Sequence, residues 1–579
     1  MKLRKQTIGT MRRQTIGKNH RNLALLGAAA IVVFAAGTFG FQQHYAELAG
    51  PGRTPFGESL YAALRLFSID FDGDRDRIKP WILEAARWLA PLVLATGLFQ
   101  LLLEVFRERY EQIKIRRAKG HYILCGDSAM IDVLAEDMLE NGQTVVLVRE
   151  DPERVDVAER RRNGAMHLSV NPESAGSLLI AGLERAKGLI VAMREDRTNV
   201  AVAMSALRHC LGNGRSLETF IHVDDTQFRD LLQRNEILIG DASVRVGVFS
   251  KCQIMARLFW AETPFELIPK ENQLAESVHI VLPSFRNVGA ALALQAARLG
   301  HYSNLEPITL HLISTDSGAE VAGLRHRYPA LDKCCRISEH RLNSEWEFAN
   351  RAIRLVEDLG TKSSVSVFTS FENPADGMQQ AILFAESLPS LYHPRVVLHG
   401  DYAIEIQKLR YQFPHVQFDL LPRADVALGM DTVIGGELDR QARMIHEEWL
   451  AREEELMEKD PNRPPKPAFR DWGALTENQK DGNRSPAEHI AIKIRAAELC
   501  RETAKQEWAR ITLDSALVET LAEMEHNRWC ADKWLNGWTY SESRNDETKK
   551  HNDLTPYNVL SEGVKDYGRD TVTKLIKYL

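Results

Sequence analysis

Side chains able to bind a ligand are concentrated near the C-terminal end of the chain. Glu525, His526, Arg528 and Trp529 fall within one predicted helix. Residues four apart share a helical face, so Glu525 and Trp529 lie together with Arg528 beside them. An aromatic ring next to an arginine suits a planar, anionic, nucleotide-like ligand through stacking and a charge-assisted hydrogen bond.

The same end of the chain supplies Trp538, His551 and Tyr557 as further candidate ligand-binding residues. Five of the ten tryptophans of the chain are Trp472, Trp508, Trp529, Trp534 and Trp538, a density that indicates a separate small domain with aromatic walls. The alternative is that these aromatic residues form a core, with Glu525 paired to Arg528. Both interpretations stay open at this stage.

The spacing of these residues is specific. The pattern runs Glu525-His526-x-Arg528-Trp529, Gly537-Trp538, His551-x-Asp553-Leu554-x-Pro556-Tyr557, with Asp471-Trp472 and Ala487-Glu488-His489-Ile490 upstream. It resembles the ryanodine-receptor repeat (RyR) domain. The resemblance implies a small, mostly helical domain over residues 468–579, after a charged helix and a proline-rich linker at 436–467.

Short apolar strands alternate with helices in the middle of the chain, which predicts parallel α/β sheets. Two tandem Rossmann-like units are expected, at 120–265 and 275–430. Strands are predicted at 122–125, 144–148, 189–193 and 219–223, then at 278–282, 308–313, 365–369 and 396–399. Helices are predicted at 130–140, 153–162 and 198–211 in the first unit.

Four residues are candidates for binding a cofactor: Gly126, Ser128, Arg149 and Asp316. Gly126 is the one glycine kept where a dinucleotide site has Gly-x-Gly-x-x-Gly. Arg149 replaces the usual acid, which indicates either a phosphorylated ribose or no dinucleotide at all. Asp316 holds a ribose or caps the next helix, and the cap is favoured. The identity of any cofactor stays open.

The first of these units resembles the RCK or TrkA-N domain that regulates potassium conductance and uptake. Two such units behind a membrane segment resemble the gating ring of ligand-gated potassium channels. The resemblance implies a homotetramer that responds to a small molecule.

Two apolar stretches precede these units. Residues 22–41 carry no charge and are long enough to cross a hydrocarbon layer of about 30 Å, and residues 81–106 form a second candidate span. Basic residues within 1–21 and after residue 106 place both termini in the cytoplasm, at the inner (plasma) membrane. A cleaved signal peptide is the competing interpretation of the first stretch.

The loop between the spans, 42–80, has helical apolar spacing at 56–67, followed by Ser68-Ile69-Asp70-Phe71-Asp72-Gly73-Asp74. This arrangement resembles the pore unit of two-transmembrane potassium channels, although only one glycine stands in the filter. In a tetramer Asp70, Asp72 and Asp74 form carboxylate rings that favour cations. The alternative is a solvated acidic loop.

Other functions have less support in the sequence. Lys and Arg number 73 against 79 Asp and Glu, a net charge of -6, so nucleic acid is not an expected partner. His446-Glu447-Glu448 lacks the second histidine of a zinc motif because position 450 is leucine, and no catalytic or metal-binding residue is predicted. We therefore expect no enzyme, with a NAD-dependent enzyme as a disfavoured third hypothesis.

The sequence as a whole predicts an ion-channel-like membrane protein whose RCK-like and RyR domains sense a ligand and control cation flux. The alternative is a non-conducting, membrane-anchored sensor that recruits a protein partner.

Overall fold

The computed structural model describes residues 16–49, 56–71, 80–150, 164–174, 176–225, 228–229, 232, 246–269, 271, 273–302, 305–369, 373–423, 428–497 and 514–578. These residues form two compact units. The first comprises 1–119, 149–170 and 180–182, and the second comprises 120–148, 171–179 and 183–579. Asp72, Asp74 and the helix predicted at 153–162 lie outside the described residues.

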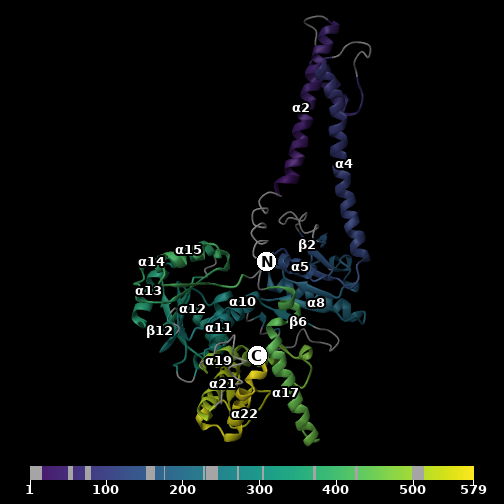
Figure 1. Ribbon diagram of the computed structural model, residues 1–579. Helices are drawn as coiled ribbons and strands as arrows, with labels where there is room; N and C mark the ends of the chain where they lie inside the picture. Colours follow the sequence, from purple (N-terminus) through teal and green to yellow (C-terminus); the bar gives the residue numbers. More distant parts are fainter. Residues whose placement is uncertain are drawn as a thin grey trace. The chain divides into compact units, whose positions relative to one another are not determined.

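The first unit contains the helices α2 (Ile16–Ala49), α3 (Phe56–Phe67) and α4 (Trp81–Arg117), which are labelled or coloured in Figure 1. The helices predicted from the apolar stretches and at 56–67 are confirmed. α2 and α4 pack closely because Gly40 has no side chain: a Cβ there would lie 2.9 Å from Leu83 Cα. Ala63 and Leu66 of α3 join the apolar cluster between these helices.

Two helical segments are long and apolar enough to cross a membrane, Leu25–Glu47 and Trp81–Phe99. Only 28% and 17% of their apolar windows are buried, whereas a core helix of a soluble protein is mostly buried. Ile31 and Trp88 keep 71% and 73% of their surface exposed. The apolar side chains of both segments are thus left largely uncovered within the described residues.

The first six-stranded sheet has the order β3-β2-β1-β4-β5-β6, the strand order of a Rossmann fold. Its strands are β1 (Tyr122–Cys125), β2 (Val145–Arg149), β3 (Met166–Ser169), β4 (Gly188–Val191), β5 (Glu218–His222) and β6 (Val246–Phe249). Its helices are α5 (Ala129–Glu140), α7 (Ser177–Ile180), α8 (Asp196–Gly212) and α10 (Lys251–Glu262). The four predicted strands are present, and the sheet has two further strands, β3 and β6, that were not predicted.

The second six-stranded sheet repeats this order as β11-β10-β9-β12-β13-β14. Its strands are β9 (Ser277–Leu282), β10 (Thr309–Ser314), β11 (Arg336–Arg341), β12 (Ser363–Phe368), β13 (Arg395–Leu398) and β14 (Gln417–Leu420). Every adjacent pair is parallel. Its helices are α11 (Asn287–Leu299), α12 (Ser317–Arg327), α13 (Phe348–Leu359), α14 (Pro374–Ser387) and α15 (Glu405–Gln412). Two tandem Rossmann-like sheets are thus confirmed.

The C-terminal region is mostly helical, as expected. It contains α17 (Arg440–Lys459), α18 (Glu477–Glu488), α19 (Ile490–Ala496), α21 (Ser515–Leu535) and α22 (Glu562–Thr573). Short strand pairs are formed by β7 (Leu267–Ile268) with β8 (Gln273–Leu274), and by β15 (Thr539–Tyr540) with β16 (Lys550–His551).

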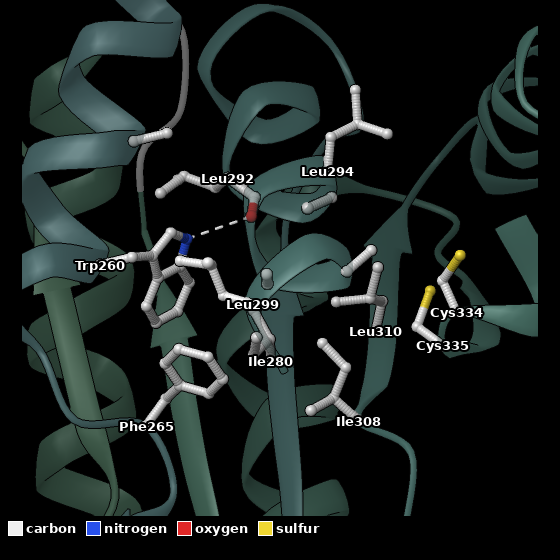
Figure 2. Close-up of a cluster of buried hydrophobic side chains, with 14 of the residues drawn as sticks. Trp260, Phe265, Ile280, Leu292, Leu294, Leu299, Ile308, Leu310, Cys334 and Cys335 are labelled. Carbon is white, nitrogen blue, oxygen red and sulfur yellow. Dashed lines mark hydrogen bonds between the residues drawn. The ribbon is translucent and has the colours of Figure 1, made fainter. Parts of the chain in front are cut away.

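One apolar cluster runs from the second sheet into these C-terminal helices. Figure 2 shows part of it, where Trp260 Nε1 donates a hydrogen bond of 3.2 Å to the carbonyl of Leu292. The same cluster includes Ile492, Leu521 and Met524 of α19 and α21. These helices therefore share a core with the second sheet, while Ala522, Tyr557 and Leu560 form a small apolar cluster of their own. The separate C-terminal domain stays a prediction.

Candidate functional site

The first turn, after β1, is held by close backbone packing. Gly126 has φ 147°, and a Cβ there would overlap the carbonyl oxygen of Ala192 at the end of β4. Gly126, the one motif glycine that is kept, is therefore required by the backbone of the fold itself.

Ser128 stands at the N-terminus of α5 but makes no capping hydrogen bond with its side chain. Its Oγ is buried and has no hydrogen-bond partner among the described residues. A buried hydroxyl at this place is one that a bound phosphate would satisfy, since helix N-termini attract anions. β1 and β4 are neighbours at the point where strand order reverses, which is where α/β sheets bind ligands.

Arg149 is the last residue of β2 and is buried, with 5% of its surface exposed. A positively charged residue therefore stands in the interior at this position. Whether it accepts a phosphorylated ribose or indicates that no dinucleotide binds stays a proposal.

The turn after β9, at the equivalent place in the second sheet, is already filled by a carboxylate. Glu320 accepts hydrogen bonds from the Phe285 backbone N–H at 2.6 Å and from Ser284 Oγ at 3.0 Å. Gly289 allows this tight turn, since a Cβ there would overlap the Ser284 carbonyl oxygen. A bound phosphate would need the same donors, so this turn is closed to it.

Asp316 stands at the N-terminal boundary of α12, where the sequence favoured a cap. Its side chain makes no capping hydrogen bond and instead pairs with Arg286 at 3.2 Å. This corrects the expected cap. Both side chains are more than half exposed, so the pair has little energetic weight.

Glu525 and Arg528 lie on the inward side of α21. Glu525 accepts hydrogen bonds from Arg528 at 2.8 and 3.1 Å and pairs with Lys493 of α19. Arg528 is 2% exposed and Lys493 is 1% exposed. Burial alone would raise the pKa of Glu525, but the charges of Arg528 and Lys493 hold it far below its usual range. The pairing left open as the alternative is therefore the one formed.

The remaining candidates form an aromatic cluster. The Trp529 and His551 rings are 5.0 Å apart and nearly perpendicular, and Trp538 lies 6.0 Å from His551. The Lys533 ammonium lies 4.6 Å from the Trp538 ring centre and 5.9 Å from that of Trp529. Burial lowers the pKa of Lys533. This cluster offers ring faces and a cation at one place.

His526 and Tyr557, the two remaining candidates, are buried residues next to this aromatic cluster. The His526 and Trp529 rings stack at 5.7 Å, and His526 Nε2 lies 2.7 Å from the carbonyl oxygen of Thr555, to which it donates. Burial lowers the pKa of His526 and raises that of Tyr557 to about 12. His526 therefore supports the Trp529 ring, and Tyr557 packs against His526 at a ring distance of 5.9 Å.

Asp70 is the only predicted pore carboxylate within the described residues. Its Oδ2 accepts hydrogen bonds from Arg65 Nε at 2.9 Å and Nη2 at 2.8 Å. Both residues are partly exposed, so this ion pair is screened by solvent. Asp72 and Asp74 fall on residues that the structure does not describe.

Sequence reasoning missed Lys493, Lys533 and Glu320. Lys533 lies four residues after Trp529 on the same helix, a spacing that was available as a signal. Lys493 and Glu320 belong to other segments of the chain than the groups they contact, so no local pattern identifies them.

Family models match two regions of the chain. The TrkA-N domain model matches residues 122–241, and the RyR domain model matches residues 509–579. The chain contains a TrkA-N domain and a RyR domain. Strands β1 to β5 of the first sheet lie within the TrkA-N match, and the aromatic cluster lies within the RyR match.

Known proteins resemble further parts of the chain. Potassium channel protein 1 of Methanocaldococcus jannaschii is 29% identical over 101 residues, which is 17% of this chain and 30% of that protein. The structure "GsuK channel bound to NAD" covers 74% of this chain and 86% of its own at 13% identity, with a TM-score of 0.39. "Crystal structure of the GsuK bound to ADP" covers 72% and 98% at 16% identity, with a TM-score of 0.36.

Proposed function

We propose that the protein is an ion-channel-like membrane protein in which the TrkA-N and RyR domains sense a nucleotide-like molecule and control cation flux. The observation that carries this proposal is the order of elements: a TrkA-N domain directly follows two apolar helices that flank a short helix. The local identity to a potassium channel supports the same assignment.

The ligand is assigned to the first Rossmann-like unit and to the RyR aromatic cluster. In the first unit, Ser128 Oγ is the buried hydroxyl that a phosphate would satisfy. In the RyR domain, Trp529 and Trp538 offer faces for a planar base, and Lys533 supplies a positive charge. Glu525 and Arg528 are assigned to packing.

Coupling follows from chain connectivity. α4 ends at Arg117, and β1 begins at Tyr122. A ligand that binds one conformation of the TrkA-N domain more tightly shifts the population toward it, and the short connection transmits that shift to α4.

The remaining assignments belong to the same proposal. The protein forms a homotetramer in the inner (plasma) membrane, with both termini in the cytoplasm and no catalytic activity. Its segments are the N-terminus at 1–21, the membrane segment at 22–106, the Rossmann-like domains at 120–265 and 275–430, the linker at 436–467 and the RyR domain at 468–579.

A non-conducting anchored sensor is the second candidate. The observation that favours it is the ion pair of Asp70 with Arg65, which places a cation beside the first predicted pore carboxylate. A ring of paired carboxylates attracts cations more weakly than a ring of free ones.

Potassium efflux from vesicles containing the full chain separates these candidates. We expect efflux above that of protein-free vesicles, and a reduced rate for Asp70→Asn. Glu58→Gln, which changes another exposed acid on the neighbouring α3, serves as the control and leaves the rate unchanged. No efflux under any condition, including a panel of nucleotides, dinucleotides and ADP-ribose, contradicts the channel and favours the anchor.

A further inference from the structure

A cavity of about 100 Å³ lies within the second compact unit, the one that comprises 120–148, 171–179 and 183–579. None of the candidate ligand residues lines it. Its walls come from β6, α10, α17, α18 and the turn Asp431–Gly435. The polar and aromatic residues that matter here are Arg257, Asp439, Arg443, Trp472, Lys480 and Arg484. Four of these are cationic and one is acidic.

Two of the four cations, Arg257 and Arg484, are paired with carboxylates. Arg257 pairs with Asp439 at 2.9 Å and also with Glu488. Arg484 pairs with Asp439 at 2.7 Å and with Asp481 at 2.8 Å. Burial alone would raise the pKa of Asp439, but Arg484 and Arg257 hold it far below its usual range.

Arg443 differs from these two arginines. It has no carboxylate partner among the described residues; it donates a 2.7 Å hydrogen bond to the Gly435 carbonyl and lies 5.9 Å from the Trp472 ring centre. Its Nε is buried and has no hydrogen-bond partner in the described part of the chain. Gly436 makes room for this guanidinium, because a Cβ there would overlap it.

We propose that this cavity binds a phosphate group, either as inorganic phosphate or as the phosphate of a small metabolite. A water molecule needs about 15 Å³ of such space, so the cavity has room for a tetrahedral oxyanion. The planar guanidinium of Arg443 supplies donors in the geometry that phosphate oxygens accept, including the buried Nε. Lys480 also lines the cavity.

The site has a structural consequence for the RyR domain. The cavity walls include α10, which follows the first sheet, and α18, which precedes α19 and α21. A phosphate bound between α10 and α18 therefore stabilises the conformation in which these two helices pack around the cavity. This proposal is independent of the channel function and of the aromatic cluster.

The test is the thermal unfolding of the full chain in detergent, titrated with inorganic phosphate, with ribose 5-phosphate, and with sodium chloride at matched ionic strength. We expect a saturable rise of the midpoint with phosphate but not with chloride. A larger rise with ribose 5-phosphate at equal concentration identifies a metabolite phosphate; an equal rise identifies the free anion.

Arg443→Gln keeps a side-chain donor for the Gly435 carbonyl and removes the charge. We expect it to weaken phosphate binding by about tenfold, as for the loss of one charge-assisted hydrogen bond. Arg440→Gln is the matched control, since Arg440 lies on the same helix with 71% of its side chain exposed and pairs with Glu437. Lys480→Gln provides a second variant, with weakened binding expected.

Two results overturn the proposal. One is a wild-type midpoint that rises no more with either phosphate than with chloride. The other is an equal phosphate response in Arg443→Gln, Lys480→Gln and Arg440→Gln.

Discussion

The two Rossmann-like units share one strand order but differ at the turn where such folds bind phosphates. In the second unit Glu320 occupies the turn and accepts hydrogen bonds from the Ser284 hydroxyl and the Phe285 backbone N–H. In the first unit the corresponding turn contains a buried Ser128 hydroxyl with no partner among the described residues. The difference between the two turns is therefore the Glu320 carboxylate. It occupies the donors of the second turn, whereas the Ser128 hydroxyl of the first turn could still donate to an anion.

The two Rossmann-like units also differ in the helices that pack against their sheets. Helices of the RyR region complete the core of the second sheet, and Glu525, Arg528 and Lys493 form a buried charged group beside it. These two differences underlie our proposal that the first Rossmann-like unit is the sensor and the second a scaffold. The variants below test this division, in order of decreasing effect.

Glu525→Gln has the largest expected effect, because it leaves Arg528 and Lys493 as buried cations without their carboxylate. Removing one partner of a buried ion pair costs about 3–5 kcal/mol of unfolding free energy. Urea unfolding of the full chain in detergent measures the loss. Glu519→Gln is the control, since Glu519 pairs with Arg569 where the two side chains are 41% and 27% exposed, and we expect a loss below about 1 kcal/mol. Equal losses would show that the RyR region does not depend on this group.

Gly126→Ala comes next, because it combines a left-handed backbone with overlap against Ala192. We expect a loss of about 3 kcal/mol, as for other strained substitutions in packed backbone. Gly142→Ala is the matched control, because Gly142 has φ 73° and open space around it. It should lose only about 1 kcal/mol, the cost of the backbone angle alone. If both variants lose the same amount, close packing is not what requires Gly126.

A histidine ladder in the second sheet makes its stability pH-dependent. His279 Nδ1 lies 3.0 Å from His311 Nε2, and His311 Nδ1 lies 3.0 Å from His340 Nε2. Burial lowers the pKa of His279 to about 4 and that of His311 to about 3, from an ordinary value of 6.5. Arg336 adds to the effect on His279, and His279, His340 and Arg351 add to that on His311.

Depressed histidine pKa values stabilise the fold above pH 6.5, and this stability is lost as the pH falls from 6.5 toward 4. At pH 4.5 the loss is about 2.5 kcal/mol for each of His279 and His311, measured by unfolding across this range. His311→Gln should flatten the pH profile, whereas His326→Gln, at an exposed position on α12, should leave it unchanged. A wild-type stability that is constant from pH 7 to 4.5 would contradict the ladder.

Glu320→Gln has the smallest expected effect, because the amide oxygen still accepts one of the two hydrogen bonds. We expect a loss of about 1–2 kcal/mol, as a charged acceptor is replaced by a neutral one. Glu339→Gln, which changes an exposed acid of the same unit, is the control, and its effect should be near zero. A neutral result for Glu320→Gln would mean that the carboxylate does not hold the second turn.

Much of this architecture was predictable from the sequence. Apolar runs such as those of β1 and β9 gave both sheets, and the apolar stretches gave α2 and α4, because buried strands and long helices have strong periodic signals. β11 was missed because its sequence, Arg336–Arg341, is mostly polar and lies at the sheet edge.

The candidate site was predictable only in part. Trp529, Trp538 and His551 do come together, but Glu525 and Arg528 face inward toward Lys493, a partner 32 residues away in sequence. Helical spacing shows which residues share a face. It does not show which face another segment of the chain covers.

The central claim is that the first unit senses a nucleotide while the second serves as a scaffold. Its most direct test is equilibrium binding of nucleotides to the full chain, with the wild type compared with Ser128→Glu and Glu320→Gln. Ser128→Glu places a carboxylate in the first turn, as Glu320 does in the second. The account predicts two binding sites in the wild type, one in the first Rossmann-like unit and one in the RyR aromatic cluster; Ser128→Glu removes the first and Glu320→Gln removes neither. An unchanged number of sites in Ser128→Glu, or the loss of a site in Glu320→Gln while the chain stays folded, would contradict it.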